Sequence, residues 1–512
     1  EGNKINKSSL KPLYEAFKND LIWFKGKTKT ENSQKALELL SKTFENGLEE
    51  KEFDTALIEK VLNSNDEYKF EKADILTSNM VINMINQIAN GREIPASLGV
   101  DFYPAVKPRL KNTVQSVIEF ISTEDIESFI VKISPKHEQY SKLKAKLLEL
   151  KKEKIESAKL EKIPTEGPHI TPGTRDYRIP YIKERLKMRK PINPIEAKKN
   201  EQLYDAALQN VIIEYQKKFD LSEDGIIGQK TIAALNSSLT DIEMKIKTNM
   251  ERYRWLSDDL AEKRIEINLP SYNLSAYNEN KLISNHAVII GRAEKKTPLM
   301  ETTMTSVTLN PFWHAPRNYA VTQLLPVFKN DPRYPIDQEI DILTLEREGW
   351  KAQDPLAIDW NKITEKNFNY LLRQKPGRKN VLGAIRFNIL NNYDIYLHST
   401  TEPWLFTNKF KAYSSGCIRV ENPDQLAKWL LAENTNFDMS KFDDIYSAYE
   451  NDDPNAKKPN AVGINLSKPL ATYITYFTTF VDEKGDLKFY DDLYKWDIGM
   501  MREWEALLGK YR

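Results

Sequence analysis

The chain has 512 residues, of which 40% are hydrophobic and 29% are charged. This length is enough for three or four domains, and the composition predicts a soluble globular protein with a sizeable core. Because 75 basic residues are balanced by 74 acidic ones, the overall charge gives no sign of a nucleic-acid or membrane-surface partner. No apolar run is as long as a transmembrane helix. The polar start of the sequence shows no signal peptide, which does not by itself indicate a cytosolic protein.

Residues 1–165 are predicted to form a helical domain without recognisable chemistry. One helix is expected to begin after Thr77 and to end at Gly91, since glycine is the usual residue after a helix. Another is expected over Ser134–Ile155, with Ser134 as its N-cap. The basic stretch Lys142–Lys154 of that helix could face a nucleic acid, but the acidic residues interleaved with it favour a solvated amphipathic helix.

A segment rich in proline and glycine, Pro164–Gly173, indicates a linker. The residues that follow, up to residue 239, carry apolar side chains at helical spacing and predict a small helical module. Near its end, Asp224-Gly225 and Gly228 predict a tight turn before a last helix. An ordinary three-helix bundle without a ligand would explain the same pattern.

From residue 240 onwards the pattern changes from helical to β-rich. Thr240–Glu243 predicts the capped start of a helix, and alternating apolar residues beyond residue 260 predict strands. Residues 319–380 are less regular and partly helical, and an insertion of this size in a β-rich domain is usually functional. Tyr473–Val481 is expected to be one long strand. The predicted fold class is therefore α+β, with several domains.

The stretch Ile395–Val420 carries the residues with chemical potential. Cys417 is the only cysteine of the chain, and His398 lies 19 positions before it, at the end of a predicted strand. A thiol becomes a good nucleophile when a base takes its proton, and Ser414–Gly416 predicts a sharp turn whose N–H groups could bind an oxyanion. The alternative is that both residues are structural, as a lone buried cysteine usually is. No second ligand lies at metal spacing, so neither a metal nor a cofactor is predicted.

His398, the spacer and the run Ser414–Arg419 (SSGCIR) together resemble the signature of YkuD-type L,D-transpeptidases. They resemble in particular the large YcbB-type subclass, in which Ser-Ser-Gly-Cys also occurs. Two residues depart from the commoner pattern: Ser415 replaces a histidine, and Ser399 replaces an aspartate. The turn at Asp224 resembles the end of a type-1 peptidoglycan-binding domain, and the N-terminal region resembles, more weakly, the helical scaffold of the subclass.

The resemblance implies three domains. Residues 1–165 would be a helical scaffold and residues 166–239 a peptidoglycan-binding-like helical module. Residues 240–512 would be a β-rich catalytic domain, in which the partly helical insertion 319–380 would form a lid that caps the site.

The resemblance also implies roles for single residues. Cys417 would be the nucleophile, His398 the general base and acid, and the backbone of Gly416 part of the oxyanion hole. The supporting residues would be Tyr396, Ser415 and Arg419. The residues expected to contact the substrate are Trp313, Trp350, Trp360, Tyr370, Asn380 and Ser399. His314, in an aromatic loop, is a rival for the base. With serine at positions 399 and 415, a backbone carbonyl is expected to orient the imidazole of His398.

The reaction implied is acyl transfer through a thioester. A peptidoglycan tetrapeptide stem would lose its terminal D-alanine and be joined to a neighbouring stem in a 3–3 cross-link, in the periplasm or cell envelope of a bacterium. Such an enzyme would contribute to cell-wall biogenesis and cell shape and would be acylated by carbapenems. Its partners could include peptidoglycan glycan and other cell-wall enzymes.

Three alternatives stay open. The same site could serve an L,D-carboxypeptidase or a protein-anchoring enzyme, or it could be degenerate in a cell-wall-binding scaffold. A sortase-like transpeptidase is disfavoured, since its arginine lies on another strand and not two residues after the cysteine, as Arg419 does.

Overall fold

The computed structural model describes residues 7–92, 108–157, 160–187, 199–236, 239–450 and 460–509. The described chain divides into two compact units. The first contains the residues up to Asp259 together with those from Tyr476 onwards, and the second contains Leu260–Thr475. In sequence, the second unit is therefore an insertion into the first. The boundaries at residues 165 and 239 stay predictions, because this division is coarser.

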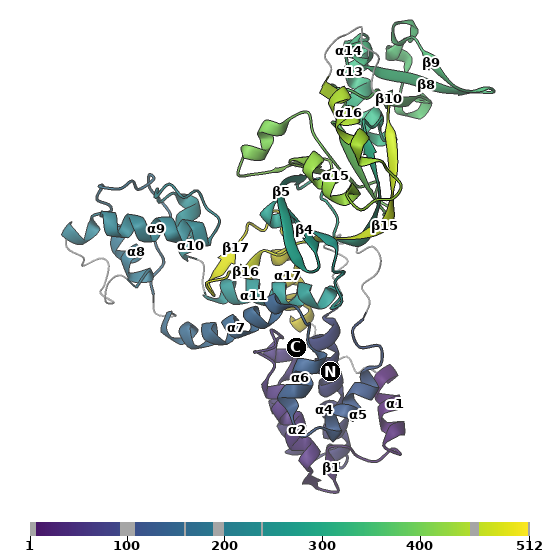
Figure 1. Cartoon of the computed structure of the whole chain (residues 1–512). Coiled ribbons are helices and arrows are strands. Elements are labelled where there is room, and N and C mark those ends of the chain that lie inside the picture. The colour runs from purple at the N-terminus through teal and green to yellow at the C-terminus, as the bar shows by residue number, and fades with distance from the viewer. Residues whose placement is uncertain are drawn as a thin grey trace. The chain divides into compact units, whose positions relative to one another are not determined.

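Helices form most of the first unit (Figure 1). The long helix α4 (Lys69–Asn90) is the centre of an apolar core, and it ends at Gly91, which has a φ of 78°. It begins well before Thr77, where the sequence placed its start, because Ala73 is already buried in the same core. The elements packed around it are α1 (Lys7–Ala16), β1 (Phe24–Lys25), β2 (Thr28–Lys29), α2 (Glu31–Ser41), α3 (Ala56–Leu62), α5 (Thr113–Ser122) and α6 (Ile126–Ile133).

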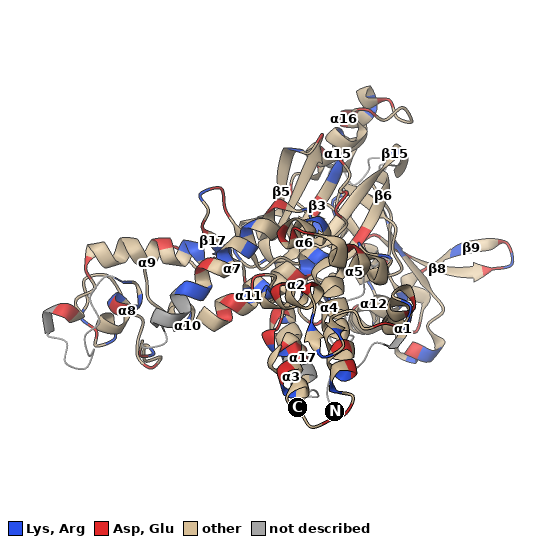
Figure 2. Cartoon of the chain, turned by 90° about the horizontal axis from the view of Figure 1, so that it is seen from below, with Lys and Arg blue, Asp and Glu red and all other residues tan. Residues whose placement is uncertain are grey.

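Ser134 ends a helix, contrary to the prediction that it begins one. Its N–H group donates to the carbonyl of Ile130 over 3.0 Å, as the residue after α6 does. The next helix is α7 (Glu138–Ser157). Basic residues outnumber acidic ones along α7, but the two kinds are interspersed (Figure 2), and Lys142 pairs with Glu138 at 2.8 Å, as expected for a solvated amphipathic helix.

The small helical module has its own apolar core. It contains α8 (Ile179–Arg185), α9 (Ala206–Lys218) and α10 (Gln229–Asn236). The predicted turn is present: Gly225 has a φ of 67°, and its N–H group donates to the side chain of Gln216 over 2.9 Å. Met188, which the sequence placed on the first helix, lies outside the described residues.

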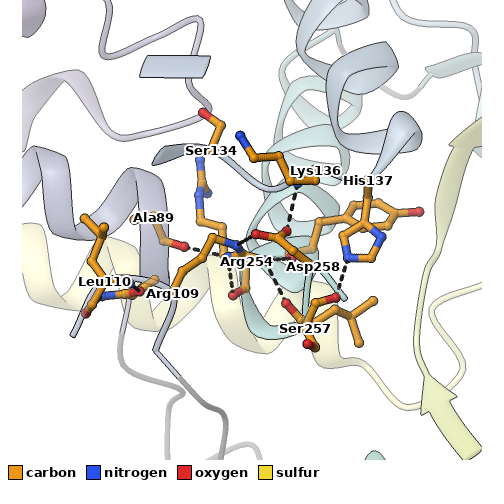
Figure 3. Close-up of polar contacts among 12 residues, drawn as sticks. Ala89, Arg109, Leu110, Ser134, Lys136, His137, Arg254, Ser257 and Asp258 are labelled. Carbon is orange, nitrogen blue, oxygen red and sulfur yellow. Dashed lines mark hydrogen bonds and ion pairs between the residues drawn. The ribbon is translucent and has the colours of Figure 1, made fainter. Parts of the chain in front are cut away.

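Helix α11 (Leu239–Trp255) begins one residue before Thr240, so Thr240 lies inside the helix and is not its N-cap as predicted. The helix leads to the end of the first unit's N-terminal segment at Asp259. Arg109 holds this end through five hydrogen bonds (Figure 3), one of them to Asp258 at 2.6 Å. The other four acceptors are the carbonyl oxygens of Ala89, Arg254, Tyr253 and Leu256, at 2.6, 3.0, 3.4 and 2.7 Å.

Two further bonds complete this arrangement (Figure 3). The N–H group of Lys136 donates to Asp258 over 2.8 Å, and Nε2 of His137 lies 3.0 Å from the carbonyl oxygen of Ser257. Arg109, Lys136, His137 and Asp258 are called the exit clasp below. Because Arg109, Lys136 and His137 bind residues 253–258, including Asp258, they fix the chain just before it leaves the first unit.

The second unit is built on a nine-stranded sheet in the order β13-β5-β14-β12-β11-β6-β15-β3-β4. β4 also pairs with β5, so the sheet closes into a ring. Its strands are β3 (Arg264–Asn268), β4 (Asn273–Asn278), β5 (Lys281–Gly291), β6 (Met300–Leu309), β11 (Ile385–Ile389), β12 (Tyr396–His398), β13 (Ala412–Ser414), β14 (Ile418–Val420) and β15 (Val462–Thr475). The helices that accompany it are α15 (Pro423–Leu431) and α16 (Phe442–Ser447).

The insertion between β6 and β11 contains a second sheet, which the sequence did not reveal. Its strand order is β7-β10-β8-β9, and β8 and β9 project as a hairpin (Figure 1). Its strands are β7 (Trp313–His314), β8 (Ile340–Glu346), β9 (Gly349–Gln353) and β10 (Leu371–Gln374), and its helices are α12 (Arg317–Tyr319), α13 (Leu325–Asn330) and α14 (Tyr334–Asp337). This subdomain, called the cap below, has its own core around Phe328 and Phe368.

The predicted strand Tyr473–Val481 is interrupted, so that prediction is wrong. β15 ends at Thr475, and the N–H group of Thr478 donates to the side chain of Asn249 over 2.8 Å in place of a strand partner. The chain continues in the first unit with β16 (Thr479–Val481), β17 (Leu487–Phe489) and α17 (Trp496–Gly509).

Candidate active site

Three neighbouring strands of the closed sheet place the candidate site. The register puts Arg386 of β11 opposite His398 of β12, and His398 opposite Arg419 of β14. Residues that lie opposite one another point to the same face of a sheet, so these three polar side chains form a row. The residues between them in sequence, such as Phe387 and Leu397, are fully buried on the other face. The alternation of the sequence thus separates a polar face from an apolar one.

The turn between β13 and β14 is held by two hydroxyl groups. Ser414 accepts the N–H group of Gly416 over 3.0 Å and donates to the carbonyl of Cys417 over 2.5 Å. Thr297 donates to the carbonyl of Gly416 over 2.7 Å. Gly416 has a φ of 120°, and a Cβ atom there would come within 3.1 Å of Ile395, so only glycine fits this turn without strain. These contacts hold the turn and position the backbone of Cys417.

This geometry corrects one predicted role. The N–H group of Gly416 is already donated to Ser414, so it is not available to an oxyanion. The N–H group of Cys417 has no hydrogen-bond partner within the described residues, and it becomes the candidate donor.

The sulfur of Cys417 is half-buried and lies among groups of β12 and of the loop before it. It is 3.7 Å from the carbonyl oxygen of Asp394, to which the thiol can donate. Burial raises the pKa of the Cys417 thiol, and the N–H group and hydroxyl of Tyr396 act against that rise. The pKa of Tyr396 is itself raised, first by burial and then by the nearby Cys417. The hydroxyl of Tyr396 is thus placed to donate to the sulfur when it is a thiolate.

His398 is 6% exposed, and its ring centroid lies 5.7 Å from that of Tyr396. Burial lowers the pKa of the imidazole to about 3, with a further contribution from Arg419, while the backbone carbonyls of Leu382 and Ser399 act in the opposite direction. The imidazole is therefore neutral at physiological pH and can accept a proton. Its Nδ1 atom has no hydrogen-bond partner among the described residues.

Cys417 and His398 are diagonal neighbours in the sheet. Leu397 pairs with Ile418, so Cys417 lies one residue before the paired segment and next to Tyr396. No hydrogen bond joins Cys417 to His398 in the part of the chain that the structure describes. Catalytic hydrogen bonds are often completed only when substrate is bound.

Arg419 and Ser415 are both engaged with other polar side chains. The guanidinium of Arg419 donates to Glu402 over 2.6 Å and more weakly to Thr400 over 3.4 Å. The hydroxyl of Ser415 is exposed and accepts from Arg292 over 3.2 Å. Glu402 therefore neutralises Arg419, the cation beside His398.

The six predicted substrate-contacting residues fall into two groups. Trp313 and Tyr370 belong to the cap core or its edge, and Trp313 also interacts with the hydroxyl of Tyr396. Trp350 is 56% exposed on the projecting hairpin. Trp313 thus adjoins the site and Trp350 is accessible, whereas Tyr370 packs against Trp360 and Phe368 of the cap.

The other three predicted contacts have structural partners in place of a substrate. Trp360 is buried in the cap, where its indole N–H donates to the carbonyl of Pro355 over 2.9 Å. Asn380 is fully buried and donates to the carbonyl of Pro311 over 2.9 Å. Ser399 accepts the N–H group of Ile385 and donates to the carbonyl of Leu382. These polar groups are used within the chain, so the structure assigns them to packing and to the strand ends.

His314, the rival base, lies on β7 opposite Arg373. Burial lowers the pKa of His314, and Arg373 and Arg386 lower it further. No contact links its ring to Cys417 in the described part of the chain, whereas His398 adjoins Tyr396, which adjoins the sulfur. The geometry favours His398.

Sequence reasoning missed Arg386 and Thr297. Arg386 lies in a short run in which apolar and polar residues alternate, and a basic residue in such a run is usually a solvent-facing residue of a strand. What points to Arg386 is that it pairs with His398 on the neighbouring strand and so faces the same side of the sheet, and this is known only from the strand register. Thr297 donates a hydrogen bond to Gly416, which lies 119 positions further along the sequence, and no local sequence pattern predicts such a contact.

The described residues contain no group of three or more His, Cys, Asp or Glu side chains able to hold a metal ion. Within the same ranges, no helix combines the length and the apolar content needed to cross a membrane.

Comparison with protein families gives three matches along the chain. Residues 262–439 match the YkuD family, described as "L,D-transpeptidase catalytic domain". Residues 8–147 match a "Scaffold domain", and residues 183–235 match a "Putative peptidoglycan binding domain".

Two individual proteins are also similar to the chain. A "Putative L,D-transpeptidase" of Haemophilus influenzae is 35% identical over 261 residues, which are 51% of this chain and 50% of that protein. This chain thus matches about half the length of that relative. The crystal structure of an L,D-transpeptidase from Xylanimonas cellulosilytica covers 52% of this chain and 93% of its own, at 14% identity and a TM-score of 0.16. A score that low supports no argument about the fold.

Residues 262–439 are therefore an L,D-transpeptidase catalytic domain of the YkuD family. This confirms the resemblance inferred from His398 and the cysteine-bearing turn. The chain combines that domain with a scaffold domain and a peptidoglycan-binding domain. The predicted fold class, a helical N-terminal region, a small helical module and a β-rich catalytic region, is also confirmed.

Proposed function

We propose that this protein is a cysteine-dependent L,D-transpeptidase that cross-links peptidoglycan through a thioester acyl-enzyme. The observation that supports it best is the placement of Cys417, just before β14, beside Tyr396 and His398 of the neighbouring strand β12 in the YkuD-type domain. The donor would be a tetrapeptide stem that loses its terminal D-alanine, and the acceptor amine of a second stem would complete a 3–3 cross-link.

In the first half-reaction the thiol proton moves from Cys417 to His398 as the sulfur attacks the amide carbonyl. The N–H group of Cys417 donates to the oxyanion, and such donors are worth about 10²–10³ in rate. The tetrahedral intermediate collapses when His398 passes its proton to the departing amine, which leaves the thioester.

In the second half-reaction an acceptor amine attacks the thioester carbonyl and gives its proton to His398. The sulfur then leaves and regains a proton. The carbonyl of Leu382 is the proposed partner that orients the imidazole, since it already acts on the ring.

The burial of both side chains supports a neutral resting pair in place of a preformed ion pair. A raised pKa of the Cys417 thiol and a lowered pKa of the His398 imidazole favour the uncharged forms. Tyr396 would then stabilise the thiolate only as it forms, which is where stabilisation accelerates the reaction.

Purified tetrapeptide muropeptides provide the test. Wild-type protein should give a dimer that has lost one D-alanine, while the Cys417→Ala variant should give none and keep its circular dichroism and melting temperature. Intact-mass measurement with a carbapenem should show one adduct on wild type and none on the variant. Cross-linking that survives Cys417→Ala would overturn the proposal.

The products also separate the remaining alternatives. A tripeptide monomer as the main product would indicate an L,D-carboxypeptidase, since water would then be the acceptor. A thiol that reacts neither with a carbapenem nor with an alkylating probe would indicate a degenerate site in a cell-wall-binding scaffold. The matched domains support the cell envelope as the site of action.

A further inference from the structure

We propose that Arg386 binds a carboxylate of the acyl donor, and that this is the carboxylate of the amino acid that leaves. The inference rests on the proposed function, because it assigns a subsite to the same reaction. It would make Arg386 a specificity-determining residue for donors with a free C-terminus next to the scissile amide.

Position is the first argument. Arg386 lies directly opposite His398 on the adjacent strand, so both point to the same face. Its guanidinium carbon lies 5.6 Å from the ring centroid of Tyr396, and Tyr396 touches the sulfur of Cys417. Only one side chain therefore separates this cation from the reacting atom.

The second argument is that Arg386 has no anion of its own. Arg419 pairs with Glu402 at 2.6 Å, and Arg373 pairs with Asp341 at 2.9 Å. Arg386 forms no ion pair or side-chain hydrogen bond with any residue that the structure describes, and its Nε atom is buried without a partner.

An unpaired guanidinium in a partly buried place is unfavourable unless an anion joins it. Arginine binds carboxylates with two parallel hydrogen bonds, which gives both strength and orientation. A carboxylate ligand would therefore use the part of Arg386 that the fold leaves free. The neighbouring cations are less suited, because Glu402 and Asp341 already neutralise them.

Covalent geometry selects which carboxylate this is. In the donor, only the amide nitrogen and one α-carbon separate the scissile carbonyl from the carboxylate of the departing residue. Any carbonyl that reaches the sulfur of Cys417 therefore brings this carboxylate within a few ångströms of it, into the reach of a long side chain on the second strand over. The pair would hold the leaving group while His398 protonates it.

A purely electrostatic role is the competing explanation. The positive charge of Arg386 also acts on Cys417, Tyr396, His398 and His314, so its removal could change rates without any contact to substrate. That role would alter the pH profile for all donors equally. A binding role would instead distinguish a donor with a free carboxylate from one without.

The experiment compares two tetrapeptide donors, one with a C-terminal carboxylate and one with a C-terminal carboxamide. Affinity is measured by calorimetry in the non-reacting Cys417→Ala background, and kcat/KM for cross-linking is measured with the intact thiol. With Arg386 present, the acid should be preferred by at least about 10-fold. Arg386→Gln should abolish the preference, mainly by weakening the acid donor, and Arg386→Lys should restore part of it.

Arg347→Gln is the matched control, since Arg347 is an exposed arginine in the turn between β8 and β9. It should keep the full preference, and circular dichroism should show that all variants are folded. The same acid preference in Arg386→Gln as in its parent, with or without a pH shift, would overturn the inference. Failure of the proposed function looks different: no cross-link would form from either donor, while the binding preference could still be measured.

Discussion

At the scale of single residues, the candidate nucleophile and base are both held in their uncharged forms. Burial raises the pKa of the Cys417 thiol and lowers the pKa of the His398 imidazole to about 3. Water, which would favour the charged forms, is largely excluded from His398. Between about pH 3 and pH 6.5 the fold therefore keeps the imidazole of His398 neutral, whereas in an unfolded chain it would be protonated.

This arrangement predicts how stability changes with pH. The pKa of a histidine is about 6.5 in an unfolded chain and about 3 for His398 in the fold, so between these values the unfolded chain binds the extra proton. The contribution of His398 is thus fully present above pH 6.5 and is lost as pH falls, by up to about 2 kcal/mol between pH 7 and pH 5. Urea unfolding at both pH values should show this loss in wild type but not in His398→Gln. Equal pH dependence of the two proteins would contradict the prediction.

Tyr396 should control the reactivity of the thiol. Its hydroxyl is placed to donate to the sulfur, and hydrogen bonds to charged groups are worth about 1.5–3 kcal/mol. Tyr396→Phe should therefore slow alkylation of Cys417 by iodoacetamide at pH 8 by at least about 10-fold, because the thiol pKa rises further. Tyr413→Phe is the control: Tyr413 lies near the same turn, but its hydroxyl bonds to Asn408. A similar rate for Tyr396→Phe and wild type would remove Tyr396 from the site.

At the scale of elements, the sequence revealed the parts whose signal is local. The strand ending in His398, the turn at Gly416 and the helix end at Gly91 each follow from a few adjacent residues. Of the two boundaries that failed, one is set by the helix that precedes it and the other by a distant partner. Ser134 has the composition of an N-cap but closes α6, and the expected strand beyond Thr475 breaks where Thr478 bonds to Asn249.

The cap and the role of Arg386 could not be predicted for a related reason. The cap strands are too short for their apolar residues to show a sustained period, and the paired residues of β7 and β10 lie 59 and 61 positions apart in sequence. The significance of Arg386 depends on the register between β11 and β12 and on the absence of an acidic partner within the described residues. Neither property is encoded near residue 386.

Two tryptophans of the cap should behave differently on substitution. Trp360 is 2% exposed and packs edge-on against Phe328, with ring centroids 5.0 Å apart, whereas Trp350 is 56% exposed. Removing a buried aromatic side chain costs about 3–5 kcal/mol, so Trp360→Ala should loosen the cap, seen as faster proteolysis and amide exchange at α13 and β10. Trp350→Ala should change stability by less than about 0.5 kcal/mol. Equal protection in both variants would show that Trp360 is not a core residue.

At the scale of the whole molecule, the chain crosses between its two units near residues 259 and 476. Both crossings are anchored in the first unit by polar contacts, which are part-buried or exposed at the first crossing and buried at the second. The exit clasp holds residues 253–258, and Thr478 bonds to Asn249 and to Asp497. The catalytic domain is therefore tethered at both of its ends to a helical unit that holds none of the candidate active-site residues.

Arg109→Ala tests whether the exit clasp is what fixes the first crossing. The variant leaves Asp258 without its charged partner and uncaps the ends of α4 and α11. Burial acts to raise the pKa of Asp258, but Arg109 and Lys136 lower it overall. Its ionised form thus depends on the clasp, and above the pKa of an unfolded aspartate, about 3.9, the pair stabilises the fold.

Breaking a buried ion pair costs about 3–5 kcal/mol, and the side chains of Arg109 and Asp258 are only 13% and 18% exposed. Hydrogen exchange of Arg109→Ala should therefore speed up at residues 86–91 and 253–258, by about 100-fold or more where exchange requires local opening. The amides of β11, β12 and β14 should be unchanged, because they belong to the other unit. Arg347→Ala, an exposed arginine, should alter neither region. Loss of amide protection in the catalytic strands as well would mean that the two units unfold together. Unchanged amide protection at residues 253–258 would show that the helix ends are stable without Arg109.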